Sequence, residues 1–309
     1  MDNHSTGVIL VPIDFTAVTA NALTVAIRLA QLLKLSVHLV HVLEPELISS
    51  GLPGRVASDN VPASLIQEGT ERLQALAMQT VQQHQVACSA SHRVGEPVEE
   101  IAFIGRETNT RLIVMGVRPG SNLLAHRQNT IAYQLVKTAD SPVLTIPADR
   151  VWPSFRRILF PVRPVPGALD KYEFSRSFIR DSQTELTVLA LFNPDEIISR
   201  QQLNDEIALL DEKLAQDGIR YQTLFQATEL AAEAVLGKAT ALDADLLIIT
   251  AALNTTSTNF FVGPFTRQVI YNAHLPVLAI RPESTLPTTT DRVAWRYGQI
   301  DTGLSALGL

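Results

Sequence analysis

The chain has 309 residues, 46% hydrophobic and 18% charged, which is enough apolar material for packed cores and excludes a disordered composition. The net charge of −6 does not indicate a basic surface for binding nucleic acid, and no apolar run is long enough to span a membrane. The polar N-terminal residues do not resemble a cleaved signal, and the single cysteine excludes an internal disulfide. We therefore expect a cytoplasmic protein without nucleic-acid or membrane partners.

Short apolar runs alternate with helical patterns along the first half of the chain. Strands are expected at Val8 to Ile13, Ser36 to Val42, Cys88 to Val94, Leu112 to Met115 and Val143 to Ile146. Helices are expected at Thr19 to Leu33, Ala63 to His84, Glu96 to Thr108 and Asn129 to Thr138. Strands that are apolar throughout and separated by helices are typical of a parallel sheet covered on both faces.

The second half shows the same alternation. Strands are expected at Ile158 to Val162, Glu185 to Leu191, Ile219 to Phe225, Leu246 to Ile249 and Val277 to Ile280, with helices between them. The prediction is an α/β protein with two tandem, doubly wound, parallel five-stranded sheets and helices on both faces of each. Strand order cannot be read from the periodicity.

The two halves are copies of one another. The residues from Val8 to Asp14 recur from Arg157 to Arg163, and Pro142 recurs as Pro276. Equivalent positions of the two copies are 149 residues apart near the start of the copies and about 134 apart near their ends. Some 15 residues are therefore missing from the second copy, most naturally from a loop over 46–62. We predict a first domain over 1–147, a linker over 148–156, a second domain over 157–282 and a tail over 283–309.

Ligands in such sheets sit beyond the carboxyl ends of the strands, where the winding changes direction. That rule selects Asp14, the segment 42–44 and the segment 116–120 in the first copy. Arg163 takes the place of Asp14 in the second copy, so the two halves cannot use that position for the same chemistry.

At these positions the first copy resembles the universal stress protein family, in the form with two family domains in one chain. The resemblance rests on an ordered set of motifs that covers nearly all of residues 7 to 147: Val11-Pro-Ile-Asp14-Phe-Thr16, His41-Val42, Val94-Gly95-Glu-Pro97, Leu112-Ile-Val-Met-Gly116 and Ser141-Pro-Val. It implies a Rossmann-like fold of the adenine nucleotide alpha hydrolase type. It also implies pairing of the two domains through the strands that end at Ile146 and Ile280, and a homodimer of the tandem chain.

Family members that bind ATP carry a glycine pattern, and in this chain that pattern falls on Gly116, Pro119, Asn129 and Thr130. Glycine lets backbone approach phosphate, which Pro119 hinders by lacking an amide, although Gly120 beside it has one. Asn129 is expected to tolerate a left-handed backbone, and Thr130 to place a hydroxyl at the head of a helix. The resemblance makes these residues candidates for nucleotide binding: Pro12, Asp14, Val42, Met115, Gly116, Gly120, Asn129 and Thr130.

Two roles stay open for Asp14 and for Gly116. The resemblance places Asp14 against the adenosine and the backbone of Val42 against the base, but an aspartate after a strand is equally suited to capping a helix. Gly116 fits phosphate contact and a simple turn equally well. In the second copy the glycine pattern is broken, with Thr250 for the first glycine and Pro264 for the hydroxyl residue. Arg163 is therefore a candidate contact for a different anion or for a carboxylate across the interface between the halves, or it is an ordinary solvated surface arginine.

Other reactive residues do not form a recognisable site. His38 and His41 lie three apart on a strand and face opposite sides, Cys88 is expected to be a buried small residue, and no metal site is inferred. The pair Glu99 and Glu100 is expected on a helix surface. An enzyme is therefore not expected.

The sequence predicts a stress-response binding or regulatory protein that senses ATP or a related adenine nucleotide weakly through its first domain, without catalysis. One alternative is a protein-interaction scaffold that binds no nucleotide. The other is a weak ATP-hydrolysing enzyme on the same fold.

Overall fold

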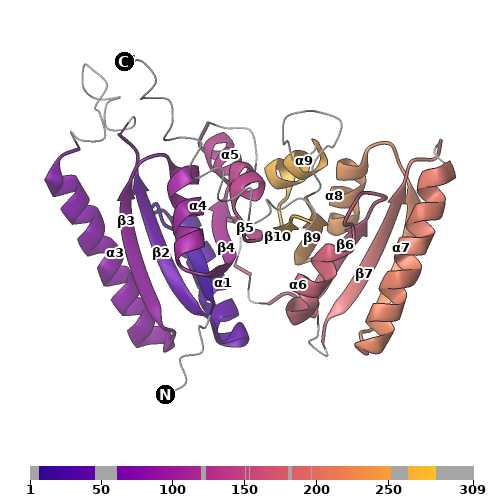
Figure 1. Cartoon of the computed structure of the whole chain (residues 1–309), viewed down its shortest axis with the longest axis horizontal. Coiled ribbons are helices and arrows are strands. Elements are labelled where there is room, and N and C mark those ends of the chain that lie inside the picture. Colours follow the sequence, from indigo (N-terminus) through magenta and orange to yellow (C-terminus); the bar gives the residue numbers. More distant parts are fainter. Residues whose placement is uncertain are drawn as a thin grey trace, which may run out of the picture.

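The two halves of the protein form one continuous sheet. The computed structural model describes residues 7–45, 61–119, 123–149, 151–152, 154–179, 183–195, 197–251 and 264–282. In these residues a 10-stranded sheet has the order β3-β2-β1-β4-β5-β10-β9-β6-β7-β8 (Figure 1). The predicted loop over 46–62 and the predicted tail over 283–309 lie almost wholly outside the described residues.

Five parallel strands make up the first half. The strands are β1 (Val8–Pro12), β2 (Ser36–Leu43), β3 (Cys88–Val94), β4 (Thr110–Val117) and β5 (Val143–Pro147). The helices are α1 (Ala17–Leu33), α3 (Ala63–His84), α4 (Pro97–Glu107) and α5 (Leu123–Thr138). The expected α3 and β3 are confirmed at both ends, whereas α5 begins two turns before the expected Asn129.

The second half repeats this arrangement. Its strands are β6 (Arg157–Val162), β7 (Glu185–Phe192), β8 (Tyr221–Ala227), β9 (Leu246–Thr250) and β10 (Val277–Ile280), again all parallel to one another. Its helices are α6 (Asp170–Ile179), α7 (Ile197–Gln216), α8 (Ala231–Ala241) and α9 (Pro264–Asn272). The expected fold class is therefore confirmed. One difference is that α6 is shorter than α1, because turns occupy the chain between β6 and α6.

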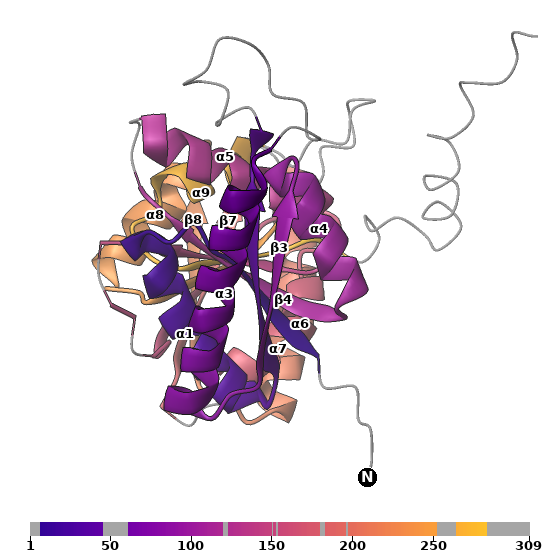
Figure 2. The ribbon, with the colours of Figure 1, turned by 90° about the vertical axis from the view of Figure 1, so that its left-hand side faces the viewer.

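Helices cover both faces of the sheet, as Figure 2 shows. The central strands are accordingly buried on both sides, and β5, β9 and β10 have no exposed residue. Each fully buried Leu, Ile or Val contributes roughly 1.5–3 kcal/mol of transfer free energy, which is the main force holding the layers together. Trp152, in the predicted linker, is 3% exposed and donates its indole N–H to the Pro147 carbonyl at 3.4 Å.

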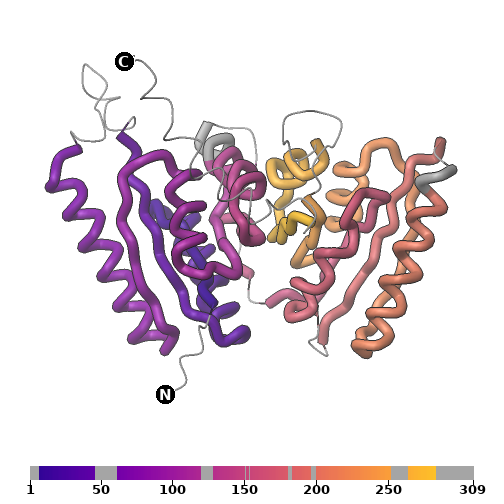
Figure 3. Tube along the Cα trace, viewed as in Figure 1, coloured from indigo at the N-terminus to yellow at the C-terminus, as the bar shows by residue number. Residues whose placement is uncertain are grey.

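The halves join through antiparallel pairing of β5 with β10, which confirms the expected pairing of the two domains. Leu144 lies opposite Leu278, and these two residues are equivalent at the repeat offset of 134. The junction therefore has local two-fold symmetry centred on this pair. The tube trace in Figure 3 shows the two halves meeting at the centre of the molecule.

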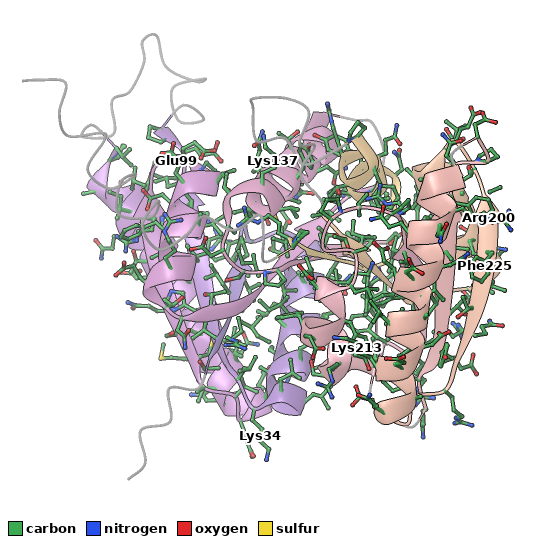
Figure 4. All side chains as sticks on the ribbon, turned by 45° about the vertical axis from the view of Figure 1, so that its right-hand side comes forward. Lys34, Glu99, Lys137, Arg200, Lys213 and Phe225 are labelled. Atoms are coloured by element: carbon green, nitrogen blue, oxygen red, sulfur yellow. The ribbon has the colours of Figure 1, made fainter. Side chains whose placement is uncertain are left out.

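Helices α5 and α9 pack against each other above this junction. Thr130 on α5 and Tyr271 on α9 share a hydrogen bond of 2.6 Å between their hydroxyl groups. Arg281, just after β10, donates to the backbone carbonyls of Lys137 and Ala139 at the end of α5. Figure 4 labels Lys137, which lies at this central contact. Side-chain and strand contacts thus both hold the halves together.

Candidate functional site

The first half has a switch point between β1 and β4. The strand order β3-β2-β1-β4-β5 means that the winding changes direction there, and in such sheets the crevice at the carboxyl ends is the usual ligand site. Asp14 follows the end of β1, and Gly116 is the next-to-last residue of β4. The structure therefore brings the two sequence candidates to the carboxyl ends of the two strands that flank the switch point.

Asp14 is exposed and organises the turn that leads into α1. Its Oδ1 accepts hydrogen bonds from the Thr16 amide at 3.0 Å, the Thr16 hydroxyl at 2.6 Å and the Thr19 hydroxyl at 2.9 Å. Burial alone would raise the pKa of this carboxyl, but the hydrogen bonds from Thr16, Thr19 and Gln128 outweigh it and lower the pKa. Asp14 therefore shapes the turn before α1 through Oδ1, whereas the N-cap of this helix is Thr16, so Asp14 does not take the capping role.

The second carboxylate oxygen of Asp14 has a weaker partner. Among the described residues, Oδ2 accepts one hydrogen bond, from Gln128 Nε2 at 3.3 Å, near the long limit for such a bond. An ionised carboxylate oxygen has room for a second donor. One oxygen of Asp14 is therefore engaged in the turn, and the other can accept a hydrogen bond from a ligand hydroxyl.

The backbone of β2 extends past the end of β1 beside this carboxylate. Pro12 is the last residue of β1 and lies opposite Val40, whose carbonyl accepts from the Ile13 amide at 2.8 Å. Backbone groups two residues apart on a strand point to the same side, so the N–H and C=O of Val42 face the space that β1 has left. This placement suits the base contact that the resemblance implies for Val42.

Gly116 is a glycine for a packing reason. A Cβ added to it would lie 2.6 Å from the Val18 carbonyl oxygen and 2.8 Å from Val18 Cγ1, so α1 could not pack against β4 with a larger residue there. Gly116 does not have a positive φ. Its neighbour Met115 is 6% exposed and belongs to the core of the sheet. Close approach of α1, rather than a turn, explains this glycine.

Two expectations about the phosphate end are wrong. Asn129 and Thr130 lie inside α5, not at its head, because the helix begins at Leu123. Asn129 is not left-handed: it is fully buried, and its Nδ2 donates to the Arg118 carbonyl at 3.1 Å, which ties α5 to the segment after β4. The hydroxyl of Thr130 contacts Tyr271 of the second half. Gly120 lies outside the described residues.

A ring stack beside the crevice was not found from the sequence. Phe15, which has a φ of 60°, contacts His41 with ring centroids 4.8 Å apart, and His41 stacks on His92 at 5.1 Å. Gly69 leaves room for this stack, since a Cβ there would lie 2.8 Å from the His92 ring. The stack joins two strands, β2 and β3, and the turn after β1, and periodicity within one strand gives no signal for such a contact.

Arg163, the second-half counterpart of Asp14, is not a solvated surface residue. It is half-buried, and its guanidinium carbon lies 3.7 Å from the centre of the Phe265 ring. Burial lowers its pKa to about 10. The second half therefore carries a stacked cation where the first half carries an anion.

The remaining candidates have structural roles. His38 bonds to Ser89 and Ser91 at 2.7 and 2.8 Å, whereas His41 bonds to the Ile13 carbonyl, so the two histidines share no partner. Cys88 is half-buried, and burial raises the pKa of its thiol to about 11. Across the described ranges no group of three or more acidic, histidine or cysteine side chains could hold a metal ion. In the same ranges, no helix combines the length and apolar character needed to cross a bilayer.

Fold and site together define a tandem protein with two doubly wound α/β halves, each with a switch point in its own strand order. Residues 6–147 match the model of the Universal stress protein family. The first half therefore belongs to the universal stress protein family, and the chain has the tandem form of that fold.

Solved structures with both halves share this architecture. A universal stress protein from Archaeoglobus fulgidus DSM 4304 is 16% identical, with a TM-score of 0.70 over 89% of this chain and 98% of that chain. A functionally unknown protein from Pseudomonas aeruginosa PAO1 is also 16% identical, with a TM-score of 0.63 over 96% of this chain and 100% of that one. At this identity the likeness shows the fold. No curated protein sequence matches the chain.

Proposed function

We propose that the first half binds an adenine nucleotide weakly and that the protein acts in a stress response as a binding or regulatory protein without catalysis. The observation that carries this proposal is the Asp14 carboxylate at the β1–β4 switch point, where Oδ2 accepts one long hydrogen bond within the described part of the chain. The backbone of Val42 faces the same space. These two groups suit a ribose hydroxyl and a base edge.

The phosphate end of the crevice is poorer than the adenosine end. Pro119 has no backbone N–H to offer. The side-chain amide of Asn129 donates to the Arg118 carbonyl, and the hydroxyl of Thr130 is hydrogen-bonded to that of Tyr271. Phosphate groups should therefore add little affinity. The expected ligand series is flat: adenosine, AMP and ATP bind with similar dissociation constants, between roughly 10 µM and 1 mM.

Calorimetric titration of the full chain with adenosine, AMP, ADP and ATP tests this proposal. Asp14→Asn keeps an oxygen for the Thr16 amide but removes the charge, and we expect it to weaken all ligands by about tenfold. Thr228→Ala is the matched control, because it removes a comparable hydrogen bond in the second half, which the Leu230 amide donates to the Thr228 hydroxyl oxygen. That variant should bind as the unaltered protein does.

The alternatives give different outcomes. The engagement of Thr130 with Tyr271 favours a scaffold without a nucleotide, and the absence of heat at millimolar ligand would establish it over the sensor. Release of phosphate from ATP above the background rate would instead support a weak ATP-hydrolysing enzyme. A steep gain in affinity from adenosine to ATP would contradict the expected loss of the phosphate end.

A further inference from the structure

The second half has a switch point of its own, with different chemistry. The strand order β10-β9-β6-β7-β8 places the change of direction between β6 and β9. Arg163 directly follows β6, and Thr250 is the last residue of β9. Thr250 is buried, and its hydroxyl donates to the Ala168 carbonyl at 2.9 Å. The position at which a doubly wound sheet usually binds its ligand is thus occupied by an arginine.

Arg163 presents hydrogen-bond donors without acceptors. Its guanidinium plane lies over Phe265, which is 8% exposed, and this contact covers one face of the group. In the described part of the chain, the guanidinium makes no hydrogen bond and no ion pair. A stacked guanidinium still offers its N–H edge, whose fork geometry matches two oxygens of one oxyanion.

Lys171 adds positive charge beneath Arg163. It is 1% exposed, and its Nζ donates to the Pro161 carbonyl at 2.5 Å and to the Thr250 hydroxyl at 3.1 Å. Both acceptors are neutral. Burial, and then the charge of Arg163, lower the pKa of Lys171, while Glu206 opposes that shift. Lys171 is therefore too enclosed to touch a ligand itself.

The positive charge is poorly compensated. Glu206 is the carboxylate that acts on Lys171, yet it forms no ion pair with Lys171 within the described residues, and its Oε2 is buried without a hydrogen-bond partner. Burial raises the pKa of Glu206 to about 7, so its negative charge is incomplete at neutral pH. Two basic groups, Arg163 and Lys171, therefore share a partly buried region with one carboxylate whose charge is incomplete at neutral pH.

We propose that the switch point at Arg163 binds a small phosphate or phosphoryl oxyanion, held by the N–H edge of Arg163. This site is separate from the proposed nucleotide site in the first half. The two halves thus carry opposite charges at equivalent positions. Asp14 suits a ligand hydroxyl that donates a hydrogen bond, and Arg163 suits an anion that accepts one.

Titration of the full chain with inorganic phosphate, at ionic strength matched with chloride, tests this site. We expect saturable heat for one phosphate per chain with a dissociation constant on the order of 1 mM. Glycerol 3-phosphate provides a second arm: tighter binding than phosphate indicates a phosphomonoester ligand, and weaker binding indicates the free ion. Either result supports the site.

Variants locate the binding. Arg163→Gln should weaken phosphate by about tenfold or more, because charged hydrogen bonds are lost. Arg267→Gln is the matched control: Arg267 stacks on Tyr271 at 5.3 Å but is exposed, and its loss should leave binding unchanged. Asp14→Asn should also leave it unchanged. If Arg163→Gln does not fold, as judged by circular dichroism, Arg163→Lys is used in its place. That variant keeps the positive charge but loses the two-pronged guanidinium, so it should bind phosphate several-fold more weakly.

Three results would overturn the proposal. The first is an absence of saturable heat up to about 20 mM phosphate. The second is unchanged affinity in Arg163→Gln, or in Arg163→Lys where that variant decides. The third is loss of binding in Asp14→Asn with retention in the Arg163 variants, which would assign the anion to the first half.

Discussion

At the scale of residues, the two crevices differ through single side chains whose surroundings fix their roles. Asp14 serves the turn with one oxygen and leaves the other with a long bond, whereas Arg163 rests on an aromatic ring. The sequence identified both positions, because the repeat aligned them. It could not reveal the stacking of Arg163, since Phe265 lies far along the chain. It also could not reveal that Thr130 is engaged by Tyr271.

Gly116 gives the first prediction at this scale. Gly116→Ala places a methyl group 2.6 Å from the Val18 carbonyl oxygen, so we expect a loss of about 1–3 kcal/mol in the free energy of unfolding. Gly237→Ala, on α8 with nothing within 4 Å of its added Cβ, should instead gain about 0.5–1 kcal/mol. Urea denaturation of both variants measures this, and equal effects would contradict the packing explanation.

Glu206 gives a prediction about pH. Its pKa is raised in the folded protein to about 7, so the stability linked to its protonation is complete below the unfolded value near 4.5 and is lost as the pH rises through about 7. The loss is on the order of 1 kcal/mol, discounted for partial exposure. Glu206→Gln should therefore stabilise the protein at pH 8 and have little effect at pH 5.

Urea denaturation at both pH values is the measurement, with Glu212→Gln as the control, an exposed carboxylate on the same helix. An effect of Glu206→Gln that is the same at pH 5 and pH 8 would be inconsistent with a buried, titrating carboxyl.

At the scale of elements, the sequence predicted most of the strands and helices because each strand is a short apolar run that needs both faces covered. The exception that affects the site is α5. Its first residues, Leu123 to Gln128, were not recognised as helical, although Ser121 and Asn122 before them are residue types that favour a helix start. That error shifted Asn129 and Thr130 to a helix head, where their expected roles depended on backbone geometry they do not have.

The end of α3 offers a prediction for a helix terminus. Gln85 follows the helix with a φ of 56°, and its N–H donates to the Val81 carbonyl, so a side chain is held in a conformation that favours glycine. Gln85→Gly should raise the free energy of unfolding by about 1 kcal/mol. Gln83→Gly, within the helix, should lower it by about the same amount. Thermal unfolding would decide, and a loss in both variants would contradict the cap.

At the scale of the whole molecule, one ten-stranded sheet unites the halves. The pairing of β5 with β10 was expected from the family resemblance, and the strand order came from the structure alone. The apolar pattern of a strand does not indicate which other strand it pairs with in the sheet. The repeat predicted two equal folds. It could not predict where they join, because the junction is a contact between segments far apart in the sequence.

Separation of the halves tests the junction. Residues 1–147 expressed alone would expose the backbone of β5 as an unpaired edge, which is a ready template for another strand. We expect this fragment to dimerise at micromolar concentration by β5 pairing with its own copy, in analytical ultracentrifugation. A folded fragment that remains a monomer under those conditions would show that β10 has features that a second β5 cannot replace.

The single hydrogen bond between Thr130 and Tyr271 has an evolutionary consequence. At the repeat offset of 134, the reciprocal positions hold Pro264 and Lys137, so this bond has no symmetry mate. Two identical subunits must accept every interface mutation twice, once on each side of their axis. A gene fusion removes that constraint, because each side can mutate alone. The joined chain was therefore free to lose a function in one copy while the other copy still supplied it with a partner.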